Sequence, residues 1–61
     1  MNAQELKGLM ESRGHLLSDA ERGVVCLYVY HGMSFNDIRG IIPGRPRHIY
    51  ERGISKLEGG E

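Results

Sequence analysis

Apolar residues at helical spacing predict a first helix near the N-terminus. The apolar stripe consists of Leu6, Leu9 and Met10. Asn2 followed three residues later by Glu5 has the pattern of a capping box, in which each residue satisfies a backbone N–H of the other. Because Gly14 interrupts the pattern, we expect a helix over residues 2–13. The stripe is narrow, which indicates that this helix depends on packing against the rest of the chain for its stability.

The next predicted helix, over residues 18–31, is apolar almost all round. Ser18 and Glu21 form a second capping-box pattern, and Gly32 stands where a left-handed residue would end the helix. One face carries Ala20, Val24, Leu27 and Tyr28, and the other carries Val25, Cys26, Val29 and Tyr30. The second face must be covered, and two candidates remain open: the N-terminal helix, or a second copy of the protein.

Residues 34–57 predict two short helices joined by a tight turn. Ser34 can cap the first helix, Pro43 should end it, and Pro46 suits the first position of the second helix. The inward-facing positions are Ile38, Ile41 and Ile42 in the first helix and Ile49, Ile54 and Leu57 in the second. This pattern is typical of a helix-turn-helix. The predicted fold class is therefore all-α, a small four-helix domain with a C-terminal helix-turn-helix and a flexible tail over residues 58–61.

Composition excludes several classes of function. A chain of 61 residues has too little material to enclose a catalytic cleft as well as a core, so we expect one domain that is not an enzyme. Cys26 is the single cysteine, which rules out an intramolecular disulfide, and the spacing of cysteine and histidine predicts neither a metal site nor a cofactor. No apolar run approaches the roughly 20 residues of a membrane span. We therefore expect a cytoplasmic protein without a membrane partner.

Charge is unevenly distributed in a chain whose formal net charge is zero. Residues 34–57 hold five Arg or Lys and two Asp or Glu, a local charge of +3. On a helical projection His48, Arg52 and Ser55 form one outward stripe of hydrogen-bonding side chains. Arginine can pair with guanine or grip a phosphate, so this surface is a candidate site for double-stranded DNA. The candidate DNA-binding residues are Arg45, Arg47, His48, Arg52, Ser55 and Lys56.

Several segments form one pattern when they are read together: Leu17-Ser18-Asp19-Ala20-Glu21-Arg22, Val24, Leu27-Tyr28, Gly32-Met33-Ser34-Phe35-Asn36-Asp37-Ile38, Ile49 and Arg52. This pattern resembles region 4 of bacterial sigma factors and the related LuxR-type DNA-binding domains. The resemblance covers residues 17–57. It implies that the last helix lies in the major groove of DNA, with Ile49 as a core position and Arg52 facing the DNA. Arg39 departs from the family, which usually has Ala there.

Two functional hypotheses follow. The first is a DNA-binding transcriptional regulator, in which Val25, Val29 and Tyr30 are available for a homodimer or partner interface. The alternative is a protein-binding regulator that keeps the fold but docks on RNA polymerase or another transcription factor without reading DNA. The arginine cluster favours the first hypothesis, and the neutral overall charge favours the second.

Overall fold

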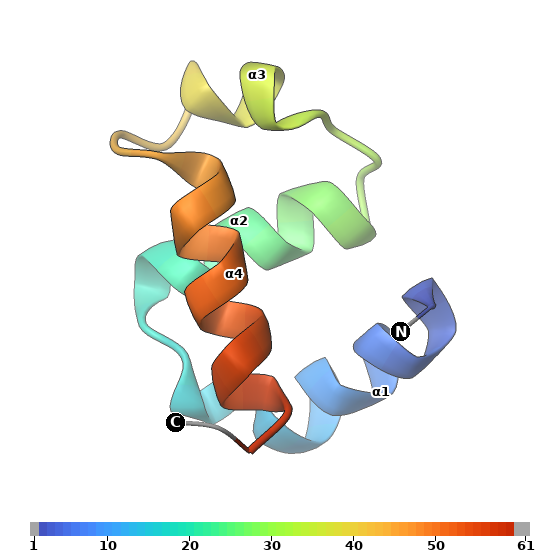
Figure 1. Ribbon diagram of the computed structural model, residues 1–61. Coiled ribbons are helices and arrows are strands. Elements are labelled where there is room, and N and C mark those ends of the chain that lie inside the picture. The colour runs from blue at the N-terminus through green and yellow to red at the C-terminus, as the bar shows by residue number, and fades with distance from the viewer. Residues whose placement is uncertain (1, 60–61) are drawn as a thin grey trace.

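The computed structural model describes residues 2–59 and folds them into four α-helices and one short 3-10 helix, with no strand among these residues (Figure 1). The elements are α1 (Ala3–Arg13), η1 (Gly14–Leu16), α2 (Asp19–Val29), α3 (Phe35–Arg39) and α4 (Pro46–Leu57). The all-α prediction is confirmed. No helix in the described part of the chain is both long and apolar enough to span a bilayer.

Three helices begin at the polar residues expected to cap them. The side chain of Asn2 accepts a hydrogen bond from the Glu5 N–H at 2.8 Å, and the Glu5 carboxylate accepts one from the Asn2 N–H at 3.1 Å. Ser18 and Glu21 make the same reciprocal pair at the start of α2. At α3, Ser34 accepts from the Asp37 N–H at 3.2 Å. These bonds satisfy N–H groups that the first turn of a helix leaves without a partner.

The ends of α2 and α3 come earlier than the sequence predicts. α2 stops at Val29, and Gly32, with φ +66, takes the expected left-handed conformation two residues after the Tyr30 cap. α3 stops at Arg39, three residues before the predicted end. Glycine at position 40 stabilises a helix poorly, and the chain continues as hydrogen-bonded turns up to Ile42. The connection to α4 passes through Gly44, whose φ of +107 favours glycine.

α4 packs across α2, and Gly53 lies in close contact with α2. A Cβ atom at Gly53 would lie 3.2 Å from a methyl carbon of Val25 and 3.6 Å from the Cβ of Glu21. On either side of this point Pro46 and Leu57 are also buried. The close approach therefore fixes how α4 sits on α2 and which of its residues face outward.

The N-terminal helix covers the second apolar face of α2. Leu6 and Met10 of α1 join Leu17, Val25 and Leu57 in one buried cluster, and Cys26 and Val29 pack against it. Val25 is wholly buried within the single chain, so the structure does not present it for the predicted dimer or partner interface. Val29 is half-buried, and Tyr30 alone of the three predicted interface residues is exposed.

The C-terminal end of α4 is tied to the end of α1. The Nη1 of Arg13 donates a hydrogen bond to the Leu57 carbonyl at 3.1 Å, and the Gly59 N–H donates to the Lys56 carbonyl. Glu58 and Gly59 thus finish the helix, although they were predicted to belong to the flexible tail. The remainder of that predicted tail, residues 60–61, lies outside the described residues.

Candidate nucleic-acid interface

α4 presents one exposed face, which reaches the edge of α2 at Arg52. Pro46 at its first position is buried, which directs the following residues outward, and the helix rotates Gly53 and Leu57 inward. The outer face of α4 consists of Arg47, His48, Glu51, Arg52 and Ser55, all exposed. Arg45, the residue before the helix, is exposed as well. The structure therefore brings five of the six predicted DNA-binding residues to the surface at or along one helix.

Lys56, the sixth predicted residue, packs toward α2 instead. Its Nζ lies 2.8 Å from Oε1 of Glu21, a carboxylate whose side chain is 6 % exposed. This ion pair gives Lys56 a structural role within the domain. The helical projection placed Lys56 only at the flank of the outward stripe, and the buried partner on α2 could not be seen from it.

Arg52 lies between the exposed outer face of α4 and the buried carboxylate of Glu21. Its Nε is 3.8 Å from Oε2 of Glu21, while 76 % of its side chain is exposed. The contact is long for a salt bridge, and exposed pairs of this kind contribute little to stability. Arg52 is thus weakly held by Glu21 and remains accessible to a ligand.

Glu21 keeps its charge because of these contacts. The hydrogen bond from Lys56 and the one from the Ser18 N–H hold the pKa of the Glu21 carboxyl below its usual 4.5, against the opposing effect of burial. The sequence predicted Glu21 as a helix cap but placed Ala20 on the inner face of α2. In the structure Ala20 is exposed and Glu21 is buried, because its carboxylate reaches both the helix start and α4.

An aromatic cluster supports the start of α4. The rings of Tyr28 and Phe35 are stacked with centroids 4.5 Å apart, and the Tyr50 ring lies 4.9 Å from the first and 5.4 Å from the second. The Cζ of Arg47 lies 5.6 Å from the centre of the Phe35 ring, within cation–π range. Burial raises the pKa of the Tyr50 hydroxyl. The cluster joins α2, α3 and α4 and gives Arg47 a fixed neighbour.

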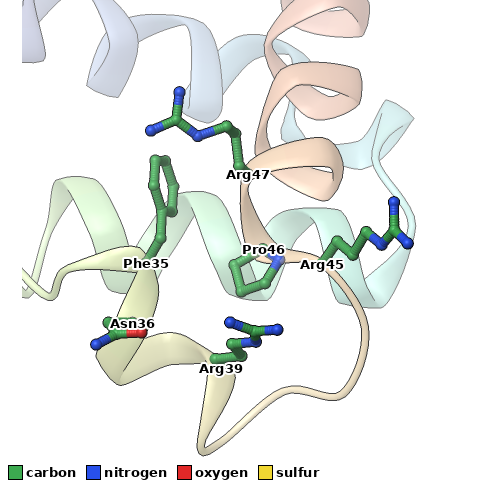
Figure 2. Close-up of a pocket in the computed structure, with 6 residues that line it drawn as sticks. All are labelled: Phe35, Asn36, Arg39, Arg45, Pro46 and Arg47. Atoms are coloured by element: carbon green, nitrogen blue, oxygen red, sulfur yellow. The ribbon is translucent and has the colours of Figure 1, made fainter.

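A groove lies between α3 and the start of α4 (Figure 2). Its volume is about 370 Å³, and it is lined by Phe35, Asn36, Arg39, Arg45, Pro46 and Arg47. We call this the α3–α4 groove. Arg39 and Asn36 were not among the predicted site residues. A signal for Arg39 was present in the sequence, because residues 39–47 contain three arginines and no acidic residue.

Other candidate chemistry is not assembled by the fold. In the part of the chain that the structure describes, no three His, Cys, Asp or Glu side chains are grouped so as to hold a metal ion. Cys26 lines a separate hollow of about 450 Å³ beside α1, together with Met10, Glu11, Tyr30 and His31.

Comparison with protein families, curated proteins and solved structures found no match to this chain. The likeness to sigma-factor region 4 therefore remains a resemblance carried by the residues quoted for it.

Proposed function

We propose that the protein is a DNA-binding transcriptional regulator that inserts the outer face of α4 into the major groove. The observation that carries the proposal is the joint exposure of Arg47, His48, Arg52 and Ser55 on a helix supported from behind by α2 and α3. A helix of 12 residues is about 18 Å long and fits the major groove, which is about 12 Å wide. Arginine is the residue that most often pairs with guanine there.

The charge distribution supports an orientation in which α3 and the start of α4 face the DNA. Residues 39–47 carry +3, so the remainder of this neutral chain carries −3. α3 and the turn that follows it lie at one end of the molecule, and α1, which holds Glu5 and Glu11, lies at the other (Figure 1). α1 as a whole is neutral, because Lys7 and Arg13 balance Glu5 and Glu11, so a polyanion is attracted to the first end and not to the second. With so few cations the salt dependence of one protomer should be shallow.

The resemblance to sigma-factor region 4 adds a third argument. In that family the segment matched by residues 17–22 caps the helix that buttresses the DNA-binding motif, and here Ser18 and Glu21 cap α2. α2 is also the helix against which α4 packs. The position matched to a DNA-facing arginine is Arg52, which is exposed.

The experiment is a selection from a random duplex pool at about 50 mM and 150 mM salt, followed by affinity measurements on the selected duplex. Arg47→Ala and His48→Ala should each weaken binding, since both change the outer face of α4. Lys7→Ala is the matched control, because it removes a positive charge from α1. Enrichment of no sequence, or equal losses in all three variants, would contradict the proposal.

The alternative, docking on RNA polymerase or another transcription factor, is favoured by one observation. The α3–α4 groove combines the apolar surfaces of Phe35 and Pro46 with arginines, a composition that also suits an acidic peptide. Failure of the duplex selection, together with a stable complex with such a protein, would support this alternative.

A further inference from the structure

We propose that Arg39 acts with Arg45 and Arg47 to bind successive backbone phosphates of a duplex along the α3–α4 groove. This inference rests on the proposed function, since it adds phosphate contacts to the same complex and assigns Arg47, at the start of the outer face, to the backbone and not to a base. It gives α3 a direct part in binding, through a residue that stands where the resembling family usually has Ala.

Three of the four basic side chains that lack an oxygen partner in the described part of the chain are Arg39, Arg45 and Arg47. Four of the eight basic side chains already have one, namely Arg13, Arg22, Arg52 and Lys56. Lys7 lies over the Tyr30 ring on α1, 5.4 Å from its centre. Across residues 2–59 the remaining three make neither an ion pair nor a side-chain hydrogen bond, and all three line one groove. Most of the cations without an oxygen partner in the described chain therefore line one groove, and the fourth, Lys7, lies on α1.

The side chains of the three arginines point in different directions. Figure 2 shows Arg39 beneath Pro46, Arg47 reaching beside Phe35, and Arg45 pointing away on the opposite side of the start of α4. A single anion is held best by donors that converge on it. Guanidinium groups that point to different sides of one helix start suit separate phosphates of an extended chain instead. The arrangement thus favours a nucleic-acid backbone over a free phosphate ion.

The residues that line the groove also favour a phosphate ligand. No acidic residue lines the groove, so nothing there repels a phosphate. Asn36, which is exposed on α3, adds an amide donor on the same side as Arg39. Contacts of this kind position a protein on a duplex without reading its sequence. Binding by the groove therefore complements base recognition by the outer face of α4.

The test compares wild-type protein, Arg39→Ala and Arg39→Lys on the selected duplex over a series of salt concentrations. Arg39→Ala should weaken binding roughly five- to tenfold at about 0.1 M salt and reduce the slope of log affinity against log salt by about 1. Arg39→Lys keeps the charge and should restore most of the slope. Arg22→Ala, which removes an arginine paired with Asp19 on α2, is the control and should leave the slope unchanged.

A second arm of the experiment distinguishes the backbone phosphates of a duplex from free phosphate ions. Inorganic phosphate, added at the ionic strength of the chloride control, should not displace the duplex beyond the effect of salt alone. Saturable displacement by phosphate would show a single-ion site and overturn the assignment to a polyanion. An unchanged affinity and slope in Arg39→Ala, with wild-type binding intact, would overturn this inference alone. Absence of duplex binding by wild-type protein would overturn the proposed function as well.

Discussion

The Nζ of Lys56 lies 2.8 Å from Oε1 of Glu21, and this contact joins the last turn of α4 to the first turn of α2. The carboxylate is buried, while the Lys56 side chain is 30 % exposed. One carboxylate thus serves as helix cap, as partner of Lys56 and as a distant neighbour of Arg52. The interhelical contact fixes the end of α4 and helps to hold its outer face away from the core.

The first prediction concerns the loss of this contact. Lys56→Met should lower the free energy of unfolding by about 1–3 kcal/mol, because it removes the main partner of a buried charge. Urea unfolding followed by circular dichroism measures the change. Lys7→Met is the control and should have a smaller effect, since Lys7 contacts only the Tyr30 ring. Equal effects of the two substitutions would show that the Glu21 contact does not stabilise the fold.

The second prediction is a dependence on acid pH. Because the pKa of Glu21 is lower in the folded protein than its ordinary value of 4.5, its stabilising effect is present above about pH 4.5. The effect should be lost as the pH falls through the folded pKa. The difference in unfolding free energy between wild type and Glu21→Gln, measured from about pH 7 down to pH 3, isolates this group. A difference that does not shrink in acid would contradict the account.

The third prediction contrasts two glycines in helices. Gly53→Ala should destabilise the protein, because the new Cβ would lie 3.2 Å from a methyl of Val25, a β-branched side chain buried in the core. Overpacking costs about 1–3 kcal/mol and exceeds the gain in helix propensity of about 1 kcal/mol.

Gly8→Ala is the matched control for that substitution. No atom lies within 4 Å of a Cβ at this exposed position in α1, so the variant should be more stable by about 0.5–1 kcal/mol. Thermal unfolding of both variants checks the pair. Stabilisation by Gly53→Ala would show that α2 and α4 do not approach as closely as the structure places them.

The fourth prediction is that Arg52, unlike Lys56, can be replaced with little loss of stability. Arg52→Ala should leave helical circular dichroism and stability nearly intact, because its side chain is largely exposed and its contact with Glu21 is long. Affinity for the selected duplex should fall by about 1–3 kcal/mol if Arg52 reads a base. An unchanged affinity would remove Arg52 from the interface.

The features predicted well from the sequence are those that local chemistry decides. Asn2, Ser18 and Ser34 cap helices through residues three positions away, and Gly32 takes its left-handed conformation through its own backbone, so residues close in the sequence contain the information. The exposure of His48 and Ser55 followed from helical periodicity once the inner face of α4 was recognised.

The features that were missed depend on partners distant in the sequence. Burial of Glu21 in place of Ala20 requires Lys56, 35 residues away, which compensates a charge that would otherwise stay in water. The covering of Val25 by α1 was one of two open alternatives, because periodicity shows that a face is apolar but not what covers it. Arg39 was not predicted as a site residue, because the turn, and not helical spacing, brings it to the same groove as Arg45.

The proposed function requires that the outer face of α4 contacts DNA. NMR titration of isotope-labelled protein with the selected duplex tests it most directly, since each backbone amide reports on its own position. The account predicts the largest shift changes from Arg45 to Ser55 and around Arg39, with α1 nearly unchanged. Shift changes centred on α1 and the hollow beside Cys26, with α4 unaffected, would contradict it.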